Sequence, residues 1–468
     1  MSRGPESRGP ELPEPAFKRF TKEIGWSSLV HSSRDIKILI AQKVLRMIAY
    51  GQSTLILVQF FREIHVSDVS LGYFMTLTLL GDVIISYFLT LYADQIGRRH
   101  VLLLGSFLMM VSGIVFVFSD HFLVLLIAAI VGVISPSGDE TGPFKSIEES
   151  VVAHLTPTKE LSDIYAWYGL FGTVGSALGS VSAGVMIDGL VENYGWTKLK
   201  VYRFMFAQYA VFAFLKLLLN WGLSDKCELR KRSEEEERRD DAIAAGDESD
   251  PLLRPTDHHD PTPSQSPKFS IWGTPLSRKS RQVVWKLCIL FALDSMGYGF
   301  MPISWVVTYF LDRWKASEST VGTLFFFTNV LNALSSLASS SMYKRLGPII
   351  AIVAAHFPSA MAMSFIPLAP NMAIAMALLL FRASTAVMDV VPRQAFLSHV
   401  VSAEERTKVM GIVNVVKTLA RSVGPIFTGM FAEKNMLGFA FLITGLLEAA
   451  HDMGMLTLFW KYNRIIKH

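Results

Sequence analysis

The sequence has little cysteine, little charge and hardly any net charge. Its only two cysteines, Cys227 and Cys288, are too few for a disulfide scaffold, and no CxxC pair or Cys/His cluster indicates a metal site. No GxxxxGK[ST] loop indicates ATP hydrolysis, and no serine or cysteine constellation suggests an enzyme. The net charge of +4 gives no reason to expect a nucleic-acid partner. The polar, proline-rich N-terminus does not have the pattern of a cleavable signal peptide.

Charged residues make up 18% of the chain and hydrophobic residues 51%, whereas an average soluble domain is about a quarter charged. The charges gather at the N-terminus, in one central stretch and in short loops. Between them lie apolar runs of the roughly 20 residues that a bilayer-crossing helix needs. We therefore predict an all-α integral membrane protein with about twelve transmembrane helices in two six-helix bundles. The expected spans are residues 36–60, 71–91, 101–118, 122–150, 166–187, 204–223, 284–310, 321–342, 348–368, 372–391, 409–431 and 437–460.

This pattern divides the chain into five parts. They are a cytosolic tail (1–35), a first bundle (36–224), a disordered cytosolic linker (225–283), a second bundle (284–461) and a C-terminal tail (462–468). The linker is expected to be disordered because its charge blocks and proline-rich low complexity cannot bury a core. Its acidic context around Leu252-Leu253 fits a dileucine pattern for sorting adaptors, or is a chance match.

Lysine and arginine in the short loops indicate the orientation in the membrane. Arg98 and Arg99 follow the second predicted helix, Lys344 and Arg345 follow the eighth, and Arg393 follows the tenth. Positive loops face the cytosol, so both termini are expected there. The plasma membrane is the default location, a vacuolar or endosomal membrane is the second choice, and we expect a monomer.

The two halves contain an internal repeat. Residues 67–72 (SDVSLG) resemble residues 317–322 (SESTVG), 250 positions later, and each is followed 25 residues after its glycine by another glycine, Gly97 or Gly347. Each half is therefore expected to be one structural unit. Repeats with a site between them are the usual plan of secondary transporters.

The turn after the second predicted helix carries a family resemblance. Residues Thr90 to Arg99 (TLYADQIGRR) resemble the G-x-x-x-D-x-x-G-R-[RK] signature of the major facilitator superfamily at Asp94, Gly97, Arg98 and Arg99, with Thr90 replacing the first glycine. The resemblance implies a twelve-helix secondary transporter in which this turn belongs to the conformational gate.

The fifth predicted helix contains a run of glycines. Gly172, Gly175, Gly179 and Gly184 resemble the glycine motif of drug-exporting members, although Ser176 stands at the proline position of that motif. The resemblance favours export slightly. Ordinary packing of small residues between helices explains the same glycines equally well.

Ionisable residues inside the predicted spans are the candidate functional groups, because charge is costly in a bilayer. The candidates for substrate binding or proton coupling are Arg46, Asp82, Asp139, Glu140, Asp294, Arg382 and Asp389. In one interpretation an acid such as Asp82 or Asp294 carries a proton while an arginine orients a polar or anionic substrate. In the other, these residues form fixed ion pairs that hold helices or gates together.

The fourth predicted span changes character after residue 134. Two prolines and two glycines between residues 135 and 143 are expected to unwind or kink it. Asp139 and Glu140 face the central cavity if the helix continues to residue 150, or belong to an acidic cytosolic loop if it ends at 134. Glu148 and Glu149 are similar to gate acids of the sugar-porter branch.

The leading functional hypothesis is a secondary active transporter that exports a small organic molecule by alternating access, coupled to protons and without a cofactor or a metal. The first alternative is proton-coupled uptake of a nutrient or an inorganic anion such as phosphate, with Arg46 and Arg382 as anion contacts. The second alternative is a membrane sensor that has the same fold and does not transport.

Overall fold

The computed structural model describes residues 25–132, 134, 143–228, 278–401 and 405–467, and the regular elements within these ranges are helices. Eleven of the described helices are long and apolar enough to cross a membrane, and Phe122–Val131 is a shorter apolar helix. This confirms the twelve-helix membrane fold. The predictions on Asp139, Glu140 and Leu252-Leu253 lie outside the described residues.

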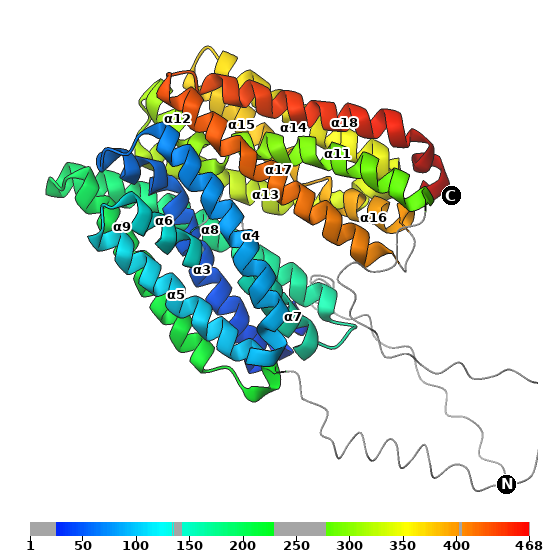
Figure 1. The fold of residues 1–468 in the computed structure, drawn as a ribbon, viewed down its shortest axis with the longest axis horizontal. Helices are drawn as coiled ribbons and strands as arrows, with labels where there is room; N and C mark the ends of the chain where they lie inside the picture. The colour runs from blue at the N-terminus through cyan, green and yellow to red at the C-terminus, as the bar shows by residue number, and fades with distance from the viewer. Residues whose placement is uncertain (1–24, 133, 135–142, 229–277, 402–404, 468) are drawn as a thin grey trace, which may run out of the picture.

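The helices fall into two successive groups (Figure 1). The first group, called the N-bundle, comprises α3 (Arg34–Glu63), α4 (Asp68–Ile96), α5 (Arg98–Phe118), α6 (Phe122–Val131), α7 (Pro143–Leu155), α8 (Leu161–Tyr194) and α9 (Lys198–Trp221). Short α2 (Trp26–His31) precedes it, and the single turn η1 (Asp225–Cys227) follows it.

The second group is the C-bundle. It comprises α11 (Arg278–Phe300), α12 (Ile303–Trp314), α13 (Glu318–Leu346), α14 (Pro348–Phe365) with the turn η2 (Ile366–Leu368), α15 (Met372–Ala386), α16 (Val390–Val400), α17 (Arg406–Glu433) and α18 (Gly438–Lys467). Helices pack in corresponding pairs: α3 on α8 and α5 on α9 in the first half, α11 on α17 and α14 on α18 in the second.

Three predicted helices are divided into two. The fourth ends at Val131 and resumes at Pro143, and the tenth is split into α15 and α16. The seventh, expected to be continuous from 284 to 310, instead ends at Phe300 and restarts after Pro302. A proline lacks the N–H that a continuous helix needs, and it is tolerated best where a helix begins.

The sequence repeat corresponds to a repeat of helix caps. Oγ of Ser67 accepts a hydrogen bond from the N–H of Ser70, and Oγ of Ser317 accepts one from Thr320, both at 3.2 Å. Each bond satisfies a backbone donor that the first turn of a helix leaves unpaired. The two helices that begin in this way, α4 and α13, are therefore started by the same residues of the repeat.

The ends of these two helices also correspond. Gly97 and Gly347 follow them with φ of 100° and 80°, a region that favours glycine. The next helix is then capped from a distance: Glu228 accepts from the N–H groups of Arg98 (2.7 Å) and Arg99 (3.0 Å). Asn463 caps α14 in the same way, through Ile349 and Ile350. We call the side of the molecule with these turns the linker side.

The two bundles contact each other at the opposite end, which we call the far side, and separate toward the linker side (Figure 1). The contact is made by glycines. A Cβ at Gly72 (α4) would lie 2.5 Å from the carbonyl oxygen of Pro425 (α17), and one at Gly184 (α8) would lie 2.3 Å from that of Glu318 (α13). Helix backbones therefore approach each other more closely than any larger residue would allow.

Ion pairs and hydrogen bonds add to the far-side contact. Arg62 of the N-bundle pairs with Asp312 at 2.8 Å, and Lys198 pairs with Glu318 at 3.0 Å. Oγ1 of Thr76 donates to the carbonyl oxygen of Ser422 at 2.7 Å. The molecule is thus held together at one end and divergent at the other.

Candidate functional site

A cavity of about 930 Å³ lies between the two bundles. The N-bundle contributes Asp82 on α4 and Lys145 on α7, and α16 lines the cavity at the linker side. Most of its lining belongs to the C-bundle. The acidic, basic and histidine residues that line it are Asp82, Lys145, Asp294, His356, Arg382, Asp389, Arg393, Lys417, Arg421 and Glu448.

Asp294 lies at the centre of the C-bundle part of this lining. Its Oδ2 accepts a hydrogen bond from Nη1 of Arg393 at 2.8 Å, and its Oδ1 lies 3.6 Å from Nε2 of His356. Arg393 also pairs with Asp389, the residue that precedes α16. The three elements α11, α14 and α16 are therefore tied together by one carboxylate.

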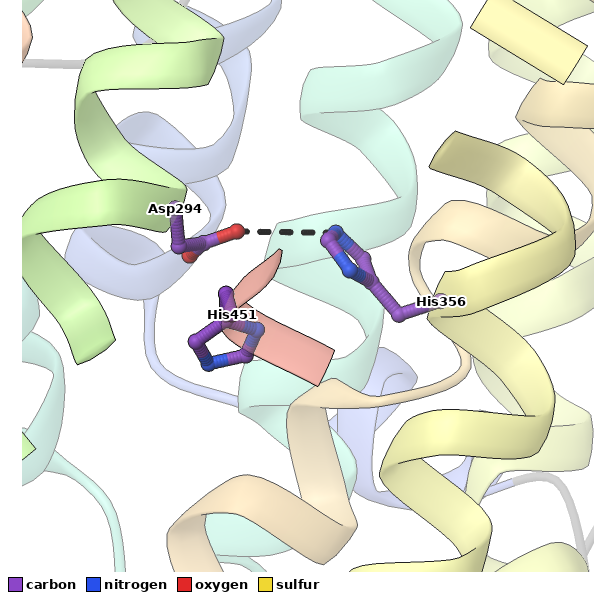
Figure 2. Close-up of side chains that lie close together, drawn as sticks. All are labelled: Asp294, His356 and His451. Carbon is purple, nitrogen blue, oxygen red and sulfur yellow. Dashed lines mark ion pairs between the residues drawn. The ribbon is translucent and has the colours of Figure 1, made fainter. Parts of the chain in front are cut away.

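The chain of contacts continues behind the cavity. Nδ1 of His356 lies 3.1 Å from both carboxylate oxygens of Asp452, and Nδ1 of His451 lies 3.0 Å from Oδ1 of the same residue. His451 and Asp452 are fully buried. Figure 2 shows Asp294 and His356 facing each other, with His451 close beside them on a third helix, and one potential ligand atom of each residue lies within 4.8 Å of the others.

A second ion pair lies beside this chain. Arg382 of α15 donates from Nη1 and Nη2 to the two carboxylate oxygens of Glu448 on α18, at 2.7 and 2.8 Å. Nη1 also lies within hydrogen-bond distance of the carbonyl oxygen of Ser359. A two-point guanidinium–carboxylate contact fixes both side chains. Arg382 therefore lines the cavity as part of an ion pair with Glu448.

Arg46 belongs to a different network inside the N-bundle. Its Nη1 lies 2.5 Å from Oε1 of Glu148, which also lies 3.3 Å from Nζ of Lys216. The hydroxyl of Tyr168 donates to Oε2 of Glu148 at 2.6 Å. Glu148 was expected at a gate. It is instead fully buried, where it joins α3, α7, α8 and α9.

Removing this carboxylate should destabilise the N-bundle. In Glu148→Ala, Arg46 and Lys216 would lose the buried carboxylate that they share, and breaking a buried pair in this way costs about 3–5 kcal/mol. We expect a clearly lower unfolding temperature in detergent. Glu149→Ala on the same helix, where the side chain is partly exposed, is the matched control and should unfold like the unchanged protein. Equal unfolding temperatures for both variants would contradict this role.

The remaining predicted residues lie in the cavity lining and at the signature turn. Asp82 lines the cavity opposite Asn332, which is its counterpart in the repeat. Of the signature turn, Gly97 ends α4, while Arg99 pairs with Asp225 at 3.0 Å; the side chain of Asp94 lies outside the described residues.

The glycine run of α8 performs two packing roles. Added Cβ atoms at Gly172, Gly175 and Gly179 would collide with α3, whereas one at Gly184 would collide with α13 of the other bundle. Close helix packing therefore accounts for all four positions.

Part of the cluster was not expected from the sequence. Glu448, His451 and Asp452 lie in the last span and His356 in the ninth, all inside apolar runs, so the rule that selected Asp294 would have selected them too. Arg393 was interpreted as a loop residue that sets orientation. The loop placement is wrong, because Arg393 lies within α16 and its side chain pairs with Asp294 and Asp389.

Comparisons with known proteins agree on the fold. A sequence model described as Major Facilitator Superfamily matches residues 38–425. The chain is 40% identical over 442 residues to an uncharacterized membrane protein of Saccharomyces cerevisiae, covering 93% of this chain and 96% of that one.

Two solved structures share the architecture at low identity. A D-xylose–proton symporter is 16% identical with a TM-score of 0.64, covering 90% of this chain and 96% of its own. A bacterial homologue of the human lysosomal transporter Spinster, in an inward-facing conformation, is 14% identical with a TM-score of 0.62, covering 92% and 96%. At such identities they show the fold alone.

Proposed function

Because the chain belongs to the major facilitator superfamily, we propose that this membrane transporter is driven by protons and moves a small organic solute through the cavity between its bundles. The observation that carries the proposal is the chain from Asp389 through Arg393, Asp294 and His356 to Asp452. Buried carboxylates and histidines in a membrane protein are characteristic of proton relays.

The geometry suggests how protonation would act on the fold. Asp294 and His356 connect α11 to α14, and Arg393 connects both to α16. A proton arriving from the cavity would reduce the charge on Asp294 and weaken its attraction to Arg393. Because α16 lines the linker side of the cavity, such a change would alter the packing at the open end. Protonation can drive a conformational change only if the proton interacts differently with the two conformations. The contact between Asp294 and Arg393 would supply that difference.

The direction of transport is a separate proposal. Export rests on the resemblance of the α8 glycines to the exporter motif, and helix packing explains those glycines without it. Uptake of an anionic nutrient is the second candidate. It is favoured by the cationic side chains of Lys417 and Arg421 on α17, which line the same cavity. Both termini are proposed to face the cytosol, with the linker side inward.

The proposed function is tested by a solute screen followed by a flux measurement. Purified protein is first screened for thermal stabilisation by organic cations, organic anions and sugars, since a ligand that binds the folded state raises the unfolding temperature. The best ligand is then followed in reconstituted vesicles with different pH on the two sides. We expect flux whose direction reverses when the pH gradient is reversed. Flux that ignores the gradient would contradict proton coupling.

A further inference from the structure

Three metal-ligating side chains from three helices converge next to the cavity. Asp294 (α11), His356 (α14) and His451 (α18) place their ligand atoms within 4.8 Å of one another (Figure 2). We propose that they form a binding site for one divalent transition-metal cation. The inference concerns the same cluster as the proposed proton relay, but it does not depend on the transport of an organic solute.

The ligand types and spacing suit such a cation. Two imidazole nitrogens and one carboxylate oxygen are a familiar donor set for Zn²⁺ and its neighbours in the first transition row. Nε2 of His356 and Oδ1 of Asp294 are 3.6 Å apart. Two tetrahedral ligands of zinc lie roughly 3.4 Å from each other, so this pair already has nearly the required spacing. The ring of His451 has to approach by at most about 1.4 Å to match it.

The charge of the cluster supports a divalent ion. The continuous chain of ion pairs contains three carboxylates, Asp294, Asp389 and Asp452, and one guanidinium, Arg393. With both histidines neutral, two negative charges remain, and buried charge has to be balanced. Two protons on the histidines would balance them, and so would one divalent cation. The other charged groups along the same cavity are Asp82, Lys145, Arg382, Lys417, Arg421 and Glu448.

The surroundings of the histidines provide a second, independent observation. Metal-binding histidines usually donate their other ring N–H to a carboxylate, which fixes the tautomer. Asp452 accepts from Nδ1 of His356 and lies equally close to Nδ1 of His451, so a neutral His356 has its lone pair on Nε2, the atom that lies toward Asp294. Nε2 of His451 is buried without a hydrogen-bond partner among the described residues. Such an atom is costly to bury, and a turn of this ring that brings Nε2 toward Asp294 and His356 would let the cation serve as its partner.

The test is a titration of the purified full-length chain, carrying a histidine-free affinity tag, with Zn²⁺ by calorimetry and with Co²⁺ by its visible absorption. We expect one cation per chain and a Co²⁺ spectrum of low-coordinate nitrogen and oxygen ligands. His356→Ala and His451→Ala should each weaken binding at least roughly tenfold, as should Asp452→Asn through loss of ligand orientation. His121→Ala, on an exposed loop of the far side, is the matched control and should bind normally.

The pH dependence of cation binding and a variant of the linker histidines give two further tests of the site. Protons compete with the cation for the histidines, so affinity should fall as the pH is lowered. The linker also contains His258 and His259, and the double variant His258→Ala/His259→Ala should retain binding.

If His356→Ala does not fold, His356→Gln replaces it. Absence of stoichiometric binding, or binding that survives in the His356 and His451 variants, would overturn the proposal. Because no transported solute enters this titration, its failure is distinct from a failure of proton-coupled transport.

Discussion

Replacing Asp294 by asparagine is expected to abolish solute accumulation driven by a pH gradient. Asp294 lies at the cavity between Arg393 and His356. An asparagine side chain has the same size, but its amide cannot take up and release the proton that is proposed to drive solute movement. In vesicles, we expect gradient-driven accumulation to fall by at least roughly tenfold, the scale of a typical coupling between two sites. Exchange of labelled for unlabelled solute at equal pH should continue, because binding and reorientation remain.

The variant is expected to fold because Arg393 keeps its contact with Asp389. Asp120→Asn is the matched control: it removes a carboxylate that pairs with Arg203 on the far side, away from the cavity. Its accumulation should equal that of the unchanged protein. The proposed role of Asp294 would be refuted by an asparagine variant that accumulates solute against a gradient as well as the unchanged protein does.

Replacing Gly184 by leucine should open the far side of the molecule. The first atom of the new side chain would lie 2.3 Å from the carbonyl oxygen of Glu318 on α13, so the bundles have to move apart. Overpacking of this kind costs about 1–3 kcal/mol, and each 1.4 kcal/mol shifts a two-state equilibrium about tenfold. We expect slower transport and a larger fraction of molecules whose cavity is reached from the far side.

This shift can be measured by labelling a cysteine introduced in the cavity. Val306→Cys on α12 is a suitable probe, because the native cysteines are buried and burial raises the pKa of Cys227 to about 12, so its reactive thiolate is scarce near neutral pH. When the thiol reagent is added on the far side only, the introduced cysteine should be labelled faster in the Gly184→Leu variant than in the protein with Gly184. Gly169→Leu, on the same helix but with nothing within 4 Å of an added Cβ, should not. Equal labelling of both variants would contradict the packing role of Gly184.

The transmembrane plan was predictable because it follows from local properties of the chain. Apolar length defined the spans, and the repeated serine and glycine of residues 67–72 and 317–322 became matching caps and matching interface glycines, Gly72 and Gly322. Where helices break was harder to predict. Pro302 divides the seventh span, whereas Pro358 and Pro425 lie inside continuous helices. The presence of a proline alone therefore does not predict where a helix breaks.

The site was only half predictable for a physical reason. A charged residue inside an apolar span can be expected to have a partner, but the sequence does not indicate which residue that partner is. Asp294 and Arg382 were found in this way, whereas their partners, His356 and Glu448, come from helices 62 and 66 positions away. Arg46 shows the same limit, because only the fold reveals that it shares the carboxylate of Glu148 with Lys216 within one bundle, away from the lining of the cavity.

Movement of protons together with solute tests proton coupling most directly. Vesicles containing the protein and an internal pH-sensitive dye start at equal pH on both sides, and a gradient of the solute identified by thermal screening is then imposed. We predict a pH change inside the vesicles that is proportional to the solute flux and absent with the Asp294→Asn variant. Solute flux through the unchanged protein without any movement of protons would contradict the central claim.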